Sequence, residues 1–357
     1  MNPASPSVAV IGGGIIGMSI AWRLARQDAR VTVFDRSTVG GESSWAAAGM
    51  LAPGGEVQDA SPLASLAMES RALYPAYVRE LETASGLAID YQECGGLDLA
   101  YSSEEWDRLE TRAAQQSALG IESKPLSAKQ LKTFWPRIEG TDLAGGRFYP
   151  GDAIVNPREV VIALAAACHK RGVEVRQHSP VTHLAVRANA VEIESNGERT
   201  EYTAAVLATG AWSSAIPLTG VPSLPAAYPV KGHLIGYHQP AQTCNTILRH
   251  GHTYLLQRAN GLLIAGASVE HVGFDRNIEP ARVAALTSAA AAVLPHLSET
   301  IPTETWIGFR PGSEEIHLGP WHSPRFHIAY GHFRNGILLA PLTAERITSE
   351  LGQFLAA

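Results

Sequence analysis

Residues 7–35 read SVAVIGGGIIGMSIAWRLARQDARVTVFD, and this stretch decides the fold. Ser7–Ile11 is a short apolar run that ends in glycines, which is typical of a buried strand. Residues 15–27 repeat their apolar positions at helical intervals, and the apolar run Val31–Phe34 predicts a second strand. We therefore expect a strand–helix–strand unit at this end of the chain.

Three glycines, Gly12, Gly14 and Gly17, form a Gly-x-Gly-x-x-Gly sequence between the first strand and the helix. Such glycines allow a tight turn and bring a pyrophosphate close to the helix N-terminus, where free N–H groups favour negative charge. Asp35 ends the second strand, where it is placed to accept hydrogen bonds from a ribose. The strand, the helix and the acid together predict a dinucleotide-binding site.

The composition restricts the class of protein. The chain has 357 residues, 45% of them hydrophobic and 17% charged, which predicts a globular protein of about two domains. Lys and Arg number 28 against 34 Asp and Glu, a net charge of −6 without a basic run, so we expect no nucleic-acid partner. The apolar run Val8–Trp22 is glycine-rich and shorter than the ~20 residues of a spanning helix, so we expect no membrane association and no export.

The three cysteines, Cys94, Cys168 and Cys244, lie far apart in the sequence. Their spacing suits no zinc site, and three cysteines cannot all pair, which argues against a disulfide scaffold. Reduced thiols in the cytoplasm are the simplest interpretation. The histidines 317, 322, 327 and 332 recur every five residues, a spacing that converges on neither a helix nor a strand, so we expect no metal site.

The rest of the chain alternates between helical and strand patterns. Helices are predicted at 61–86, 104–119, 158–171, 281–294 and 337–354, with Pro341 in the first turn of the last helix. Strands are predicted at 173–175, 181–186, 191–194, 201–202, 205–208, 254–257, 262–265 and 326–330. Nucleotide-type signals lie at both ends and in the middle, which predicts two domains built from interleaved segments.

Residues 40–53 (GGESSWAAAGMLAP) favour FAD over a nicotinamide cofactor. The small residues let the backbone pass beneath a large planar ring, and Ser43 and Ser44 can reach phosphate or ribityl oxygens. A nicotinamide-binding domain has no need of such a segment. The alternative is an Ala/Gly-rich loop that serves packing alone.

With four further blocks, these segments resemble the flavoproteins of the D-amino-acid oxidase superfamily, and within it the glycine oxidase family of the thiamine-biosynthesis type. The further blocks are 208–212 (ATGAW), 229–232 (PVKG), 308–312 (GFRPG) and 331–341 (GHFRNGILLAP). The resemblance runs from residue 8 to residue 341. It implies an α/β protein (α+β overall), with a Rossmann-like FAD-binding domain of the glutathione-reductase type interleaved with an antiparallel-sheet substrate domain. Segments 1–85, 148–222 and 306–357 would form the first domain, and 86–147 and 223–305 the second.

The resemblance also implies roles for individual residues. Arg310 is similar to the arginine that binds the substrate carboxylate, for which a guanidinium offers a planar fork of two donors. Tyr254 and Arg334 match further substrate-contacting positions. The implied cofactor-binding residues are Gly12, Gly14, Ile15, Ile16, Gly17, Asp35, Arg36, Ser43, Ser44, Ala48, Gly49, Met50, Val181, Gly210, His332, Phe333, Arg334, Asn335, Gly336, Ile337 and Leu338.

The implied activity is FAD-dependent oxidative deamination of glycine or another small amine or amino acid. The Cα–H leaves as a hydride to the flavin, the imine hydrolyses to a 2-oxo acid and ammonia, and O2 reoxidises the flavin to give H2O2. We expect non-covalent FAD, because no cysteine lies near Arg310 in the sequence. The resemblance further implies a homo-oligomer, and the N-terminus of the final helix could stabilise negative charge on reduced flavin.

Some residues depart from the family pattern. Ser313–Gly319 replaces the turn that usually follows the arginine motif, Trp45 is bulky where small residues are common, and His252 and Val269 flank the expected pocket. Two other functions therefore stay open. One is a dehydrogenase for a D-amino acid, proline or sarcosine that passes electrons to a carrier other than oxygen, and the other is a tailoring or non-catalytic flavoprotein with a repurposed pocket.

Overall fold

The computed structural model describes residues 5–58, 60–138 and 143–356. Residues 1–4, 59, 139–142 and 357, which fall within the predicted domain segments, lie outside the described residues. None of the helices in the described ranges is both long and apolar enough to cross a membrane.

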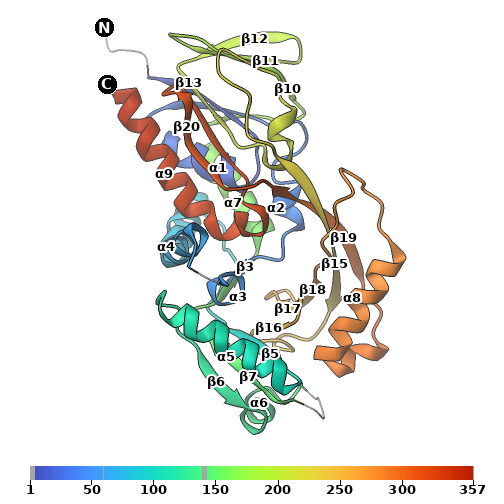
Figure 1. The fold of residues 1–357 in the computed structure, drawn as a ribbon. Helices are drawn as coiled ribbons and strands as arrows, with labels where there is room; N and C mark the ends of the chain where they lie inside the picture. The colour runs from blue at the N-terminus through green and yellow to red at the C-terminus, as the bar shows by residue number, and fades with distance from the viewer. Residues whose placement is uncertain (1–4, 59, 139–142, 357) are drawn as a thin grey trace.

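The strand that precedes the glycine motif belongs to a six-stranded sheet (Figure 1). Its strand order is β20-β21-β13-β1-β2-β9, and every neighbouring pair is parallel except β20 with β21. The strands are β1 (Ser7–Ile11), β2 (Arg30–Phe34), β9 (Glu174–Arg176), β13 (Ala204–Leu207), β20 (His317–Ser323) and β21 (Phe326–Tyr330). The predicted strand–helix–strand unit is confirmed, with helix α1 at Ile15–Ala25.

The two faces of this sheet pack against different layers, because successive residues of a strand point to opposite sides. Val8 and Val10 belong to a core shared with the helices α1, α4 (Pro62–Ser85), α7 (Pro157–Lys170) and α9 (Gly336–Ala356). Ala9 and Ile11 pack instead against the four-stranded sheet of β12 (Glu198–Tyr202), β11 (Val191–Ser195), β10 (Val181–Val186) and β14 (Leu218–Thr219). The result is a three-layer unit of helices, sheet and sheet.

A second, eight-stranded sheet has the order β19-β15-β18-β17-β16-β5-β7-β6, and is antiparallel except for the pair β16–β5. Its strands are β5 (Gly96–Ala100), β6 (Lys124–Ser127), β7 (Gly145–Tyr149), β15 (Tyr228–His238), β16 (Ile247–His250), β17 (Thr253–Gln257), β18 (Leu262–Gly266) and β19 (Glu304–Gly312). Helices α5 (Ser103–Ser117), α6 (Ala128–Phe134) and α8 (Pro280–Val293) accompany it (Figure 1). The pairing of β15 with β19 crosses the predicted domain boundary at residue 306, so the exact division stays a prediction.

The remaining elements are short. They are α2 (Ser43–Ala46), β3 (Met50–Leu51), α3 (Pro53–Glu56), β4 (Tyr91–Gln92), β8 (Ala153–Val155) and the 3-10 helices η1 (Gly210–Ala215), η2 (Pro295–Glu299) and η3 (Phe333–Asn335). β3 and β4 both pair with β8 in a small sheet. The predicted mixed α/β class is confirmed, and the helices agree with the predicted ones to within one or two residues.

Pro341 is the exception, because the predicted first-turn position is wrong. Helix α9 begins at Gly336, so Pro341 lies in its second turn, where it cannot donate to the carbonyl of Ile337. The Tyr74 hydroxyl of α4 donates to that carbonyl at 2.5 Å instead. A neighbouring helix therefore supplies the donor that the proline lacks.

Candidate active site

An elongated cavity of about 380 Å3 runs from the glycine motif to strands β15 and β19. At one end it is lined by Gly12, Asp35, Arg36 and Val181, and at the other by Tyr254 and Arg310. Residues that are far apart in the sequence thus line the same cavity. The cavity spans the predicted adenosine end and the predicted substrate end.

The glycine motif is shaped by close backbone packing. Gly12 has φ of +107°, and a Cβ there would overlap the carbonyl oxygen of Ala208, which follows the neighbouring strand β13. Gly14, Ile15 and Ile16 line the cavity, so the N-terminus of α1 faces it. Gly17 does not line it: a Cβ at Gly17 would overlap the Gly12 carbonyl, so this glycine lets the helix pack closely, and its predicted cofactor contact stays a prediction.

Asp35 ties the glycine motif to the end of β2. Its Oδ2 accepts from the Gly13 N–H at 2.7 Å, and its Oδ1 accepts from the Ser37 N–H at 2.8 Å and from the Ser37 hydroxyl at 3.2 Å. A carboxylate oxygen has two lone pairs, so Oδ2 retains acceptor capacity for the predicted ribose hydroxyls. Arg36 next to it stacks over the Trp212 ring at 3.8 Å and pairs with Glu42 at 2.8 Å. The arginine therefore has a fixed position on the wall of the cavity.

Residues 46–48 are held in place by side chains that donate hydrogen bonds to their carbonyl oxygens. Arg258 donates to the carbonyls of Ala47 at 3.1 Å and Ala48 at 3.5 Å, and the Trp306 indole donates to that of Ala46 at 2.9 Å. Burial lowers the pKa of Arg258 to about 10, which leaves it charged at neutral pH. Residues 46–50, which line the cavity, are thus fixed from behind.

The serines and the tryptophan of this segment have separate positions. Ser44 accepts from the Ile15 N–H at 2.9 Å, and Ser43 donates to the carbonyl of Phe309. Both serines line the cavity, but Trp45 does not. Its ring packs against Arg158, whose guanidinium lies 3.8 Å from the ring centroid. The bulk of Trp45 is therefore accommodated outside the cavity.

Arg310, Tyr254, Arg334 and Glu56 come together at the substrate end of the cavity. Arg334 pairs with Glu56 at 3.2 Å, whereas no carboxylate in the described ranges lies within ion-pair distance of Arg310. Burial lowers the pKa of Arg310, and burial raises the pKa of Tyr254 despite the two nearby arginines. The site therefore offers an anion a guanidinium whose recorded hydrogen bonds go only to backbone carbonyls through Nη1, together with a phenol that stays protonated.

The N-terminal end of α9 closes another part of the wall. His332, Phe333, Asn335, Gly336 and Ile337 line the cavity, but Leu338 does not, so its predicted contact with the cofactor stays a prediction. Burial lowers the pKa of His332 to about 4, and its Nε2 lies 3.0 Å from the Thr343 hydroxyl. The imidazole is therefore neutral at physiological pH.

The structure brings together all of the other predicted site residues. Ala48, Gly49, Met50 and Gly210 also line the cavity, as do His252 and Val269. No sequence signal points to Glu56 or Arg258, because each acts through a partner distant in the sequence. Residues 313–319, which depart from the family pattern, are not part of the cavity wall.

These features fit FAD. The cavity is long enough to reach from the end of β2 to β19, and it offers a helix N-terminus and an acid beneath the expected dinucleotide. A sequence model of the family described as "FAD dependent oxidoreductase" (DAO) matches residues 7–350. The chain belongs to this family. FAD is the cofactor of this FAD dependent oxidoreductase.

Relatives within the family are close in sequence and structure. The glycine oxidase of Geobacillus kaustophilus is 33% identical over 340 residues, which cover 94% of this chain and 90% of that protein. The crystal structure of glycine oxidase from Geobacillus kaustophilus has a TM-score of 0.90 at 31% identity and covers 98% of this chain and 95% of the other. The bifunctional protein ThiO/ThiG of Trichormus variabilis is 34% identical over 350 residues, which are 95% of this chain and 52% of that protein.

The remaining chemistry-bearing residues form no second centre in the part of the chain that the structure describes. Cys94, Cys168 and Cys244 are all free, and burial raises the pKa of Cys168 and of Cys244 to about 12. Within residues 5–58, 60–138 and 143–356, no group of three or more His, Cys, Asp or Glu is arranged to hold a metal ion.

Proposed function

We propose that this FAD dependent oxidoreductase oxidises glycine or another small amine or amino acid, with Arg310 as the receptor for the substrate carboxylate. The observation that carries the proposal is the guanidinium of Arg310 on the cavity wall, which has no carboxylate partner in the described ranges and lies near a protonated phenol. A planar guanidinium binds a carboxylate through two parallel hydrogen bonds. The glycine oxidase relatives support glycine as the first substrate to test.

The residues around Arg310 orient the substrate and exclude water. Tyr254 is 7% exposed and can donate its hydroxyl to the same carboxylate. Arg334 adds positive charge, which Glu56 partly neutralises at 3.2 Å. Bound FAD would supply the acceptor for a hydride from the substrate Cα. This route requires no general base, because the amine binds in its neutral form and the hydrogen leaves as a hydride.

Several finer points belong to the same proposal. We infer that O2 is the electron acceptor and H2O2 the product, that FAD is bound non-covalently, and that the protein works as a homo-oligomer in the cytoplasm. The family resemblance supports O2 as the acceptor, non-covalent FAD and the homo-oligomer. The three free cysteines support the cytoplasm. The two interleaved domains, with the boundaries predicted from the sequence, are proposed on the same basis.

Replacement of Arg310 by Leu tests the proposal. Loss of a buried charged partner costs about 2 to 5 kcal/mol, so kcat/KM for glycine should fall by about thirtyfold to several thousandfold while FAD stays bound. Arg346→Leu is the matched control, because Arg346 pairs with Glu69 on the surface, away from the cavity. An R310L variant with unchanged turnover would refute the assignment.

Anaerobic mixing with glycine, sarcosine, D-alanine and D-proline separates the alternatives. Bleaching of the flavin absorbance that recovers in air with formation of peroxide supports an oxidase. Bleaching without recovery in air identifies a dehydrogenase. If none of the four compounds bleaches bound FAD, the proposal of amine oxidation is wrong.

A further inference from the structure

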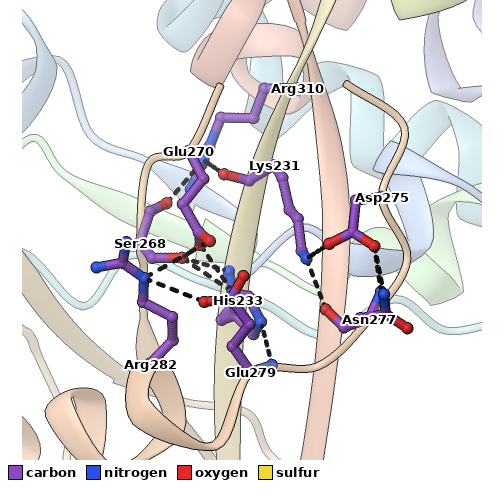
Figure 2. A network of polar contacts seen from close by, with 9 residues as sticks. All are labelled: Lys231, His233, Ser268, Glu270, Asp275, Asn277, Glu279, Arg282 and Arg310. Carbon is purple, nitrogen blue, oxygen red and sulfur yellow. Dashed lines mark hydrogen bonds and ion pairs between the residues drawn. The ribbon is translucent and has the colours of Figure 1, made fainter. Parts of the chain in front are cut away.

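A buried polar network lies directly behind Arg310, on strand β15 and on the loop that follows β18 (Figure 2). Arg310 Nη1 donates to the carbonyl of Ser268 at 3.0 Å, and its distance to the carbonyl of Lys231 is 3.5 Å. One edge of the guanidinium is therefore fixed by backbone oxygens. The position of the Ser268 carbonyl decides where this edge points.

The Ser268 side chain is fixed in turn by two neighbours. Its hydroxyl donates to Glu270 Oε1 at 2.5 Å and accepts from the His233 N–H at 2.8 Å. Glu270 and Lys231 also exchange two backbone hydrogen bonds, at 2.9 and 3.0 Å. This short stretch of loop is thus attached to β15 by both its backbone and its side chains.

His233 determines the direction of the hydrogen bonds in the network. The Glu279 N–H donates to His233 Nε2 at 3.0 Å, so that nitrogen carries no proton. Nδ1 then carries the proton and donates to Glu270 Oε1 at 2.8 Å. A neutral histidine and an ionised glutamate result. The half-exposed Arg282 lies 3.6 Å from the other oxygen of Glu270.

The far end of the loop is anchored to the same strand. Lys231 is fully buried, and its Nζ donates to Asp275 at 2.7 Å and to the carbonyl of Asn277 at 2.6 Å (Figure 2). Between the two anchors, Val269 lies on the cavity wall. The loop that holds Arg310 therefore also forms part of the cavity wall.

We propose that Ser268, Glu270 and His233 are positioning residues, which hold the Ser268 carbonyl so that the free edge of Arg310 faces the substrate carboxylate. This inference rests on the proposed function of Arg310. The network acts on Arg310 through a backbone carbonyl, and it keeps the buried carboxylate of Glu270 bonded to Ser268 and His233. Arg310 is consequently oriented without an ion pair that a substrate would have to displace.

The test measures carboxylate binding separately from turnover. Acetate, which has a carboxylate and no amine, is titrated into the FAD-loaded enzyme, and its Kd is read from the change in flavin absorbance. We expect Ser268→Ala to raise this Kd about tenfold, since it removes two hydrogen bonds from the chain that orients Arg310. The KM for glycine should rise with it, while kcat at saturation stays within about twofold. Ser268→Thr, which restores the hydroxyl, should recover the wild-type Kd.

The outcomes distinguish the inference from the proposed function. If Arg310→Leu abolishes acetate binding but Ser268→Ala leaves the Kd unchanged, the positioning role is wrong and the role of Arg310 stands. If Arg310→Leu leaves acetate binding unchanged, the proposed function itself fails. A Ser268→Ala variant that lowers kcat as strongly as it raises KM would indicate a general structural role and overturn the inference. Glu270→Ala breaks the same chain at the next residue and replaces Ser268→Ala if that variant does not fold.

Discussion

Replacement of Tyr74 by Phe should destabilise the protein because one buried carbonyl group, that of Ile337, loses its hydrogen-bond donor. Tyr74 is fully buried, and its hydroxyl donates at 2.5 Å to the carbonyl of Ile337. In a regular helix that carbonyl would accept the N–H of residue 341, but Pro341 has none. The Tyr74→Phe variant keeps the ring, which packs against Tyr77 and Tyr91, and removes only the donor.

The magnitude follows from the burial of the acceptor. A buried carbonyl that loses its donor costs about 1 to 3 kcal/mol, and Pro341 has no N–H with which to replace the Tyr74 hydroxyl. Pro341→Ala restores that N–H, so Tyr74→Phe should cost about 1 kcal/mol less in the Pro341→Ala background than in the wild type. Ile337 lines the cavity, so the same carbonyl also affects how the start of α9 faces the cofactor.

Urea unfolding of the four proteins of this double-mutant cycle, at one saturating FAD concentration, measures the coupling. Tyr77→Phe provides the matched control. Tyr77 lies on the same helix, and its hydroxyl is paired with Ser19 at 2.7 Å, so Pro341→Ala should not change its cost. If Tyr74→Phe costs the same in the wild type as in the Pro341→Ala background, the hydroxyl does not replace the missing donor and the reasoning is refuted.

Two further predictions concern the cofactor segment and acid stability. Arg258→Met removes the donor from the carbonyls of Ala47 and Ala48, so the Kd for FAD should rise about tenfold to a hundredfold by fluorescence titration of the apoprotein. Arg158→Met, which removes the hydrogen bond to the carbonyl of Trp45 and the stacking on the Trp45 ring, both outside the cavity, should change it much less. Burial lowers the pKa of His327 to about 4, so between about pH 6.5 and pH 4 the unfolded chain binds a proton that the folded chain does not. Stability therefore falls as the pH drops through this range, by about 2 kcal/mol at pH 5 for this group, and urea unfolding of His327→Leu should lack that part of the loss.

The cofactor end could be predicted from the sequence because its signals are local. Gly12, Gly14 and Asp35 belong to one strand–helix–strand unit, so their spacing alone places them at the same edge of a parallel sheet. Gly17 shows the limit of such reasoning. The same glycine spacing serves both cofactor contact and helix packing, and only the distance to the Gly12 carbonyl distinguishes the two.

The substrate end could be predicted only in part. The family motif identified Arg310, but Glu56 and Ser268 reach the same site from α3 and from the loop after β18, and no sequence spacing links these segments. The position of Pro341 was predicted wrongly for a similar reason. Local rules disfavour a proline in the second turn of a helix, and it is tolerated here because Tyr74, on a helix distant in the sequence, replaces the missing donor.

The strand segment 229–233 (PVKGH) contributes to the position of Arg310 in two ways, although the two are far apart in the sequence. A Cβ at Gly232 would lie 2.5 Å from Arg310 Nη1, so glycine leaves the space in which the guanidinium lies. The residues on either side, Lys231 and His233, anchor the loop whose Ser268 carbonyl holds that guanidinium. Side chains alternate along a strand. Gly232 can therefore make room for Arg310 on one face, while Lys231 and His233 fix the loop of Ser268 from the other. The motif is therefore best explained as the support of Arg310, the proposed carboxylate receptor, although Lys231 and His233 themselves do not line the cavity.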